Sequence, residues 1–156
     1  MFVHTNNYYL CLRNMKTGEL KYNSCLYYSA NALARVMGKM AEEEFSKTGL
    51  APTYAFVLMA VNSTPGIQPK ELSEYLQLTP STVTRLIDKM EFKGYLERKN
   101  CGRSTEIFPT EKSLTLNEQI KTSWEELHKR YSNLVGEAEG KELTEKINQA
   151  IDNILK

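Results

Sequence analysis

The stretch that decides the fold is residues 79–90, Thr79-Pro80-Ser81-Thr82-Val83-Thr84-Arg85-Leu86-Ile87-Asp88-Lys89-Met90. Threonine is a favoured residue at a helix N-cap, and proline is tolerated at the first helical position, so a helix is predicted to begin at Pro80. Apolar residues then recur at i, i+3, i+4 and i+7, namely at Val83, Leu86, Ile87 and Met90. This spacing predicts one buried face, and it leaves hydroxyls and cations on the opposite face.

The neighbouring segments extend this helix into a larger unit. Residues 68–76 predict a shorter helix directly before it, and Gln77-Leu78 predicts the tight turn between the two. After it, residues 95–99 and 104–108 alternate as strands, and a glycine-containing connection, 100–103, joins them into a hairpin. Two helices and a hairpin in this order predict a winged helix-turn-helix.

The flanking helices carry more apolar surface than one small domain needs. Residues 22–47 repeat apolar residues at helical spacing. Thr110 is expected to cap a next helix that carries a long apolar stripe, and a last helix with a similar stripe follows a break bracketed by Gly136 and Gly140. We therefore expect a second copy of the chain to cover them. The predicted fold is mainly α with a small β-wing, divided into an N-terminal extension of uncertain structure (1–21), a first dimerisation helix (22–50), the winged helix-turn-helix domain (51–109) and C-terminal dimerisation helices (110–156).

Charge is distributed unevenly along the 156 residues, although the formal net charge is only +1. Residues 85–103 hold six Lys/Arg against three Asp/Glu, a local charge of +3, whereas residues 110–156 hold seven against nine, a local charge of −2. Positive charge concentrated around the helix and hairpin is the pattern expected where a protein meets phosphates. It favours double-stranded DNA as the partner.

Other classes of protein find little support in the sequence. The three cysteines, Cys11, Cys25 and Cys101, are odd in number and widely spaced, which fits neither a disulfide framework nor a metal site. The first residues lack the pattern of a secretory signal, and the longest apolar run, residues 54–61, is far shorter than the roughly 20 residues of a membrane span. We expect a cytoplasmic protein with no catalytic constellation, metal or cofactor.

One run of residues resembles a known family. The run is Pro69-x-Glu71-Leu72-Ser73-x-x-Leu76-x-Leu78-x-x-Ser81-Thr82-Val83-Thr84-Arg85-Leu86-Ile87-x-x-Met90-x-x-x-Gly94-Tyr95-Leu96-x-Arg98. It closely resembles the multiple antibiotic resistance regulator (MarR) family, and the helix order from residue 22 to the C-terminus is similar too. The resemblance implies a homodimeric transcription regulator, usually a repressor, and many such proteins release DNA when a small aromatic ligand or an oxidant acts on them.

The hairpin departs from the pattern of that family. An acidic residue usually precedes the arginines of the wing, but here the connection reads Asn100-Cys101-Gly102-Arg103-Ser104. Arg103 matches a wing arginine, while the acid that would pair with it is missing. We therefore expect a more mobile wing, with specificity resting mainly on residues 79–90.

The predicted DNA contacts lie on that helix and on the hairpin. Arg85 is the first candidate to bond a base or a phosphate, and Lys89 is expected at a phosphate. Of Arg98 and Lys99, one is expected to pair with a nearby acid and the other to face phosphate. The full set of predicted contacts is Ser81, Thr82, Thr84, Arg85, Lys89, Arg98, Lys99 and Arg103.

For two candidate sensing sites, plain packing is the competing interpretation. Cys25 with nearby tyrosines resembles the first helix of peroxide-sensing members of the family, but the tyrosine expected four residues later is Ser29, so inert packing is the competing interpretation. Side chains on one predicted helix are also spaced to line an effector pocket, for which core or dimer packing is the alternative. The candidates for that pocket are Tyr28, Trp124, His128 and Tyr131.

The principal alternative function is a winged-helix module that holds another protein through the same surface, without sequence-specific DNA binding. The near-neutral net charge favours it slightly. Salt dependence separates the two functions, because DNA binding releases counterions and weakens steeply with salt.

Overall fold

The computed structural model describes residues 22, 24–102 and 104–156, and the chain divides into two compact units, residues 1–39 and 40–156. Helix α2, Leu26–Phe45, begins in the first unit and ends in the second. A short 3-10 turn, Ser46–Thr48, follows it and ends at Gly49, whose φ of 70° is a left-handed conformation. Both features agree with the helix predicted over residues 22–47.

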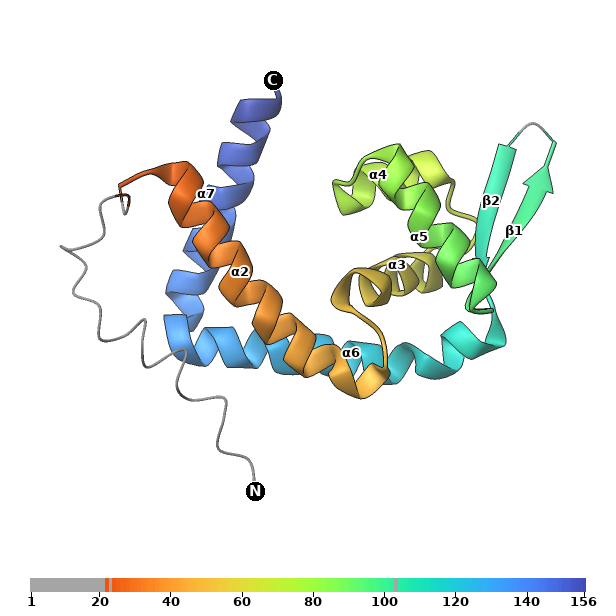
Figure 1. Cartoon of the computed structure of the whole chain (residues 1–156), viewed down its shortest axis with the longest axis horizontal. Coiled ribbons are helices and arrows are strands. Elements are labelled where there is room, and N and C mark those ends of the chain that lie inside the picture. The colour runs from red at the N-terminus through yellow and green to blue at the C-terminus, as the bar shows by residue number, and fades with distance from the viewer. Residues whose placement is uncertain (1–21, 23, 103) are drawn as a thin grey trace. The chain divides into compact units, whose positions relative to one another are not determined.

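The helix-turn-helix is built from three short helices, α3 (Pro52–Ser63), α4 (Pro69–Leu76) and α5 (Pro80–Phe92) (Figure 1). Each begins with a proline, whose missing N–H is one of those that a first helical turn leaves unpaired. The turn between α4 and α5 passes through Gln77, which adopts a left-handed φ of 52°. Both predicted helices of the unit are therefore confirmed.

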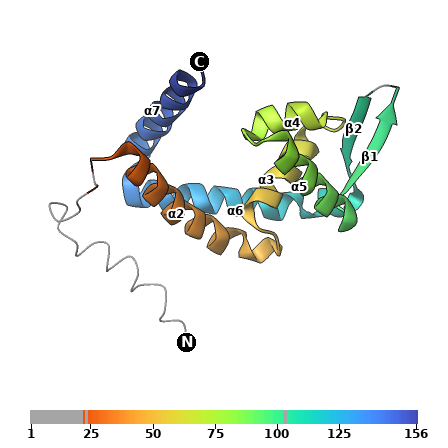
Figure 2. The ribbon, with the colours of Figure 1, turned by 45° about the horizontal axis from the view of Figure 1, so that its top comes forward.

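The wing is an antiparallel hairpin of β1 (Leu96–Cys101) and β2 (Ser104–Pro109), which stands beside α5 in both views (Figures 1 and 2). Leu96 pairs with Pro109 and Cys101 with Ser104, so β1 runs two residues further towards the turn than the sequence predicted, whereas β2 begins at Ser104 as predicted. Gly102 has a φ of 66° in this turn. Arg103 lies outside the described residues.

The core lies between the three short helices, the wing and the next helix. Ile67 forms an isolated bridge with Ile107, which joins the loop before α4 to β2. The largest fully buried side chains are mostly aliphatic and come from each of these elements and from the end of α2: Phe45, Leu58, Leu72, Ile87, Met90, Ile107, Ile120, Val57, Val61, Val83 and Ser113.

The chain ends in two long helices, α6 (Glu111–Val135) and α7 (Glu137–Leu155). The predicted break is narrower than expected, because Gly136 alone makes it, with a φ of 97°, and Gly140 lies inside α7. The apolar stripe predicted along α6 is buried only in part: Ile120 and Leu127 are buried, whereas Trp124 is 45% exposed. No residue of α7 is buried.

Thr110 does not cap α6 as predicted. It occupies the N-cap position, but its hydroxyl makes no capping bond and instead donates to the carbonyl of Gly94 at 2.7 Å. One turn on, the ammonium of Lys112 donates to the carbonyl of Lys93 at 2.8 Å. The start of α6 is thus fastened to the end of α5.

Within the part of the chain that the structure describes, no helix is both long enough and apolar enough to cross a bilayer.

Candidate nucleic-acid interface

Hydroxyl groups gather at the N-terminus of α5. Thr79 Oγ1 accepts the backbone N–H of Thr82 at 3.3 Å and shares hydrogen bonds with the hydroxyls of Ser81 at 3.2 Å and Thr82 at 2.8 Å. The predicted cap is therefore confirmed. Because the unpaired N–H groups of the first turn also point outwards, this end of the helix suits an anionic partner.

Thr84 differs from its neighbours. Its hydroxyl donates to the carbonyl of Pro80 at 2.9 Å, one turn back in the same helix. The proton is therefore engaged, and only the lone pairs of its oxygen remain to accept a bond from outside.

The two cations of α5 lie on its exposed face. Arg85 makes no hydrogen bond or ion pair with any residue that the structure describes. The ammonium of Lys89 lies 5.0 Å from the centroid of the Tyr54 ring, within the range of a cation–π contact. Arg85 is thus open to a partner, while Lys89 has a contact that fixes its position.

The inner face of α5 is structural, as predicted. Val83, Ile87 and Met90 have no exposed surface, and Leu86 is half-buried. The helix therefore separates a packed face from a polar one.

Arg98, at the start of β1, is engaged with two acids of α5. Its guanidinium bonds Asp88 Oδ1 at 2.5 Å and Glu91 Oε2, and its backbone N–H donates to Glu91 Oε1 at 3.3 Å. Of the two candidates Arg98 and Lys99, Arg98 is therefore a residue that pairs with acids.

Lys99 is also occupied, although more loosely. Its ammonium lies 2.7 Å from Glu97 Oε1 and 4.7 Å from the centroid of the Phe108 ring, and its side chain is half exposed. An exposed pair of this kind is weak and exchanges readily, so Lys99 remains accessible to a phosphate.

Sequence reasoning missed Lys112. Besides its bond to the end of α5, its ammonium lies 4.3 Å from the centroid of the Tyr95 ring. A lysine at this place satisfies a carbonyl that the end of α5 leaves unpaired and also suits the negative end of the helix dipole. The signal available in the sequence was a lysine two residues after Thr110, near the Gly94-Tyr95 pair that ends the previous helix.

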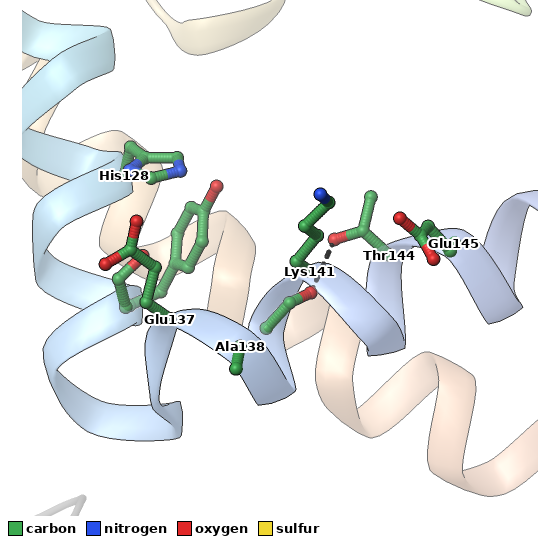
Figure 3. A pocket seen from close by; sticks show the side chains of 9 residues that line it. His128, Glu137, Ala138, Lys141, Thr144 and Glu145 are labelled. Carbon is green, nitrogen blue, oxygen red and sulfur yellow. Dashed lines mark hydrogen bonds between the residues drawn. The ribbon is translucent and has the colours of Figure 1, made fainter.

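An open pocket of about 580 Å³ lies at the elbow between α6 and α7 (Figure 3). His128 and Tyr131 line it from α6, with ring centroids 5.0 Å apart, and Figure 3 shows Lys141 and Glu145 of α7 on its other side. Trp124, the third candidate on this helix, is not among the lining residues. Tyr28 lies on the part of α2 that belongs to the first unit, so this pocket does not test it.

The structure adds no support for redox sensing at Cys25. Cys25 is exposed and carries a free thiol just before α2, with its carbonyl accepting the N–H of Ser29 at 2.9 Å. Cys11 and the side chain of Cys101 lie outside the described residues. No group of three His, Cys, Asp or Glu in the described part of the chain is placed to hold a metal ion.

One pair on α6 has shifted pKa values. A hydrogen bond from Lys129 lowers the pKa of Glu126, and the same bond raises the pKa of Lys129. Both groups are on the surface, 2.8 Å apart and one turn from each other, so the pair belongs to a solvated helix face.

A capped helix with a polar, cationic outer face, a second helix packed before it and a hairpin beside it define the class of this protein: it is a winged helix-turn-helix protein.

Comparison with known proteins relates part of the chain to a family. Residues 48–104 match the model of the MarR family. The HTH-type transcriptional regulator YwoH of Bacillus subtilis is 28% identical over 106 residues, which are 68% of this chain and 74% of YwoH. The matched segment, residues 48–104, is therefore similar to the MarR family of transcription regulators.

Solved structures share the fold. PcaV from Streptomyces coelicolor, in complex with its natural ligand, is 18% identical, with a TM-score of 0.76 over 85% of this chain and 96% of that one. A MarR-family regulator from Listeria monocytogenes, in complex with a 26mer DNA, is 24% identical, with a TM-score of 0.70 over 83% of this chain and 88% of that one. The fold predicted from the sequence, mainly α with a small β-wing, is confirmed.

Proposed function

We propose that this chain is a homodimeric repressor that binds a pseudo-palindromic operator and releases it when a small molecule binds. The observation that carries the DNA-binding part is the outer face of α5, where hydroxyls at a helix N-terminus lie beside an arginine with no partner among the described residues. The 26mer DNA in the Listeria complex supports the same reading.

In this proposal α5 enters the major groove, and its first turns meet the bases. Arg85 reads a guanine edge or bonds a phosphate, and Ser81 and Thr82 bond phosphates beside it. Thr84, whose proton is engaged within the helix, accepts a hydrogen bond from a donor on a base edge. Lys89 contacts the backbone further along the helix. Lys99 and Arg103 contact DNA from the wing.

Dimerisation is proposed from the apolar surface that the chain leaves uncovered. The stripe on α7 consists of Leu143, Ile147, Ile151, Ile154 and Leu155, and Leu155 is 78% exposed. Monomeric proteins rarely expose a continuous apolar stripe of this length. A two-fold dimer buries it and places two copies of α5 about 34–36 Å apart, one helical turn of DNA.

Effector control is proposed at the elbow pocket, near two of the predicted residues, His128 and Tyr131. Its volume of about 580 Å³ falls within the range of small-molecule sites. PcaV was solved with its natural ligand, which supports small-molecule control in a protein of this fold.

The test is selection of bound DNA from a random pool, followed by anisotropy titration of the selected site at several salt concentrations. We expect enrichment of an inverted repeat and an affinity that falls steeply with salt. Binding without sequence preference, combined with salt-insensitive affinity for a protein, would instead support the interaction module. Repeating the titration with small aromatic compounds and with His128→Ala tests the effector.

A further inference from the structure

We infer that Arg98 is a positioning residue. Together with Asp88 and Glu91 it locks the wing to α5, the recognition helix of the proposed complex, and so sets the angle at which the wing and α5 meet DNA. This inference rests on the proposed DNA binding, and it goes beyond it by removing Arg98 from the DNA contacts and giving a function to two acids on the recognition helix.

The first argument is geometric. Asp88 and Glu91 are three residues apart on α5, so their carboxylates project from neighbouring turns. Arg98 bonds one carboxylate with each terminal nitrogen of its guanidinium, and its backbone N–H donates to Glu91 at 3.3 Å. Three bonds from one residue of β1 to one helix fix both the distance and the rotation between them.

The second argument concerns exposure. The side chain of Arg98 is 28% exposed, that of Glu91 36% and that of Asp88 57%, whereas both members of the single pair Lys70–Glu74 are more open, at 86% and 68%. Exposed single pairs contribute little, but forked arginine pairs in a network, partly shielded from water, hold a defined geometry. Only arginine presents two donors in a rigid fork that reaches two carboxylates together.

The third argument concerns charge. Asp88 and Glu91 lie on a helix that is proposed to face polyphosphate, where a carboxylate repels the ligand. Two acids on this helix should therefore lower DNA affinity, and another role is needed to account for them. Holding Arg98 is what their contacts show them doing.

These arguments lead to a test in which the sign of the effect decides. If Arg98 contacted phosphate, Glu91→Gln would free it and also remove a repulsive charge, so operator affinity would rise. Because Arg98 positions the wing, Glu91→Gln is expected to lower operator affinity about 5- to 10-fold, although the protein becomes more positive. Arg98→Ala lowers it by a similar factor.

The decisive measurement is a double-mutant cycle in anisotropy titrations at fixed salt. Arg98→Ala combined with Glu91→Gln is expected to be no weaker than either single variant, because all three lose the same lock. The charge-reversed pair Arg98→Glu with Glu91→Arg should recover part of the affinity that either reversal alone removes. Glu97→Gln, also on β1 but paired only with exposed Lys99, is the matched control and should not weaken binding.

Each outcome has one meaning. Higher affinity for Glu91→Gln, or additive losses in the cycle, would overturn the positioning role. Far-UV spectra and melting temperatures of the variants serve to check that they fold, and Glu91→Gln keeps the shape of the side chain. If the unaltered protein binds no operator, the proposed function fails instead. The cycle measured by chemical denaturation would still reveal whether Arg98 and Glu91 are coupled.

Discussion

Helices α5 and α7 are both amphipathic, yet they place their apolar faces in opposite environments. Val83, Ile87 and Met90 of α5 are completely buried against the rest of the winged helix, whereas α7 buries no residue, and Ile147 is 40% exposed. In α5 the chain itself satisfies the apolar face, so the polar face remains for a partner. In α7 the apolar face is what remains. The same amphipathic pattern therefore leaves a polar face on α5, which suits DNA, and an apolar face on α7, which suits a second protein surface.

The largest expected effect comes from the inner face of α5. Ile87→Ala removes a fully buried side chain, and such substitutions cost about 2–5 kcal/mol because the cavity closes only in part. Urea denaturation should show this loss of unfolding free energy, and DNA binding should fall with it. A loss below about 1 kcal/mol would mean that this face is less tightly packed than its burial indicates.

The apolar face of α7 should respond differently. Ile147→Asp is expected to leave the helix content of the chain unchanged and to raise the dimer dissociation constant on the order of 100-fold or more, because a two-fold interface loses the contact in both copies. Sedimentation velocity over a dilution series measures it. Gln149→Asp, on the other side of the same helix, is the matched control. An unchanged dissociation constant for Ile147→Asp would exclude this face from the interface.

The outer face of α5 is the third test. Arg85→Ala should cost about 1–3 kcal/mol of operator binding if it reads a base, with no loss of stability, since Arg85 makes no hydrogen bond or ion pair with the described residues. Lys89→Ala should weaken all sequences alike and reduce the salt slope by about 0.9. Anisotropy titrations of operator and scrambled duplexes separate the two. Unchanged affinity for Arg85→Ala would reject its reading role.

These contrasts also mark what the sequence reveals. Caps and helix starts depend on local chemistry, so Thr79 and Pro80 predicted the start of α5 correctly. Burial depends on distant neighbours. The stripe on α6 therefore looked uniform although Trp124 is exposed.

The contacts of the candidate interface also divide into those set by the local sequence and those set by distant neighbours. Periodicity predicted which face of α5 packs, because the face is a property of one helix. The two acids that Arg98 holds were not identifiable, since they lie seven and ten residues before it and meet it only after the chain turns into β1. Likewise, Thr110 is in the right place for a cap, but its hydroxyl bonds to Gly94 across the joint with α5.

A smaller effect is expected at the start of α5. Thr79→Ala removes the oxygen that accepts the N–H of Thr82, and loss of an N-cap costs about 1 kcal/mol. Thermal unfolding should detect it as a modest fall in melting temperature. Thr115→Ala is the control, because that hydroxyl only bonds the carbonyl of Glu111 within α6. Equal effects at both positions would show that Thr79 contributes no specific cap.

The smallest effect is expected at the exposed charges of α6. Glu126 pairs with Lys129 on a solvated surface, unlike Arg85, which has no such partner among the described residues. Glu126→Gln should therefore change neither operator binding nor, at high salt, stability. The bond from Lys129 lowers the pKa of Glu126 in the folded chain. Any stabilisation is therefore present above the ordinary glutamate pKa and is lost as the pH falls through the lowered one. Denaturation of the original chain and the variant at neutral and acidic pH, in low salt, tests this. If Glu126→Gln lowered the free energy of unfolding at neutral pH as much as Thr79→Ala does, then α6 would depend on its surface charges. Its outer face would then not be an ordinary solvated helix face, and the contrast with the outer face of α5 would fail.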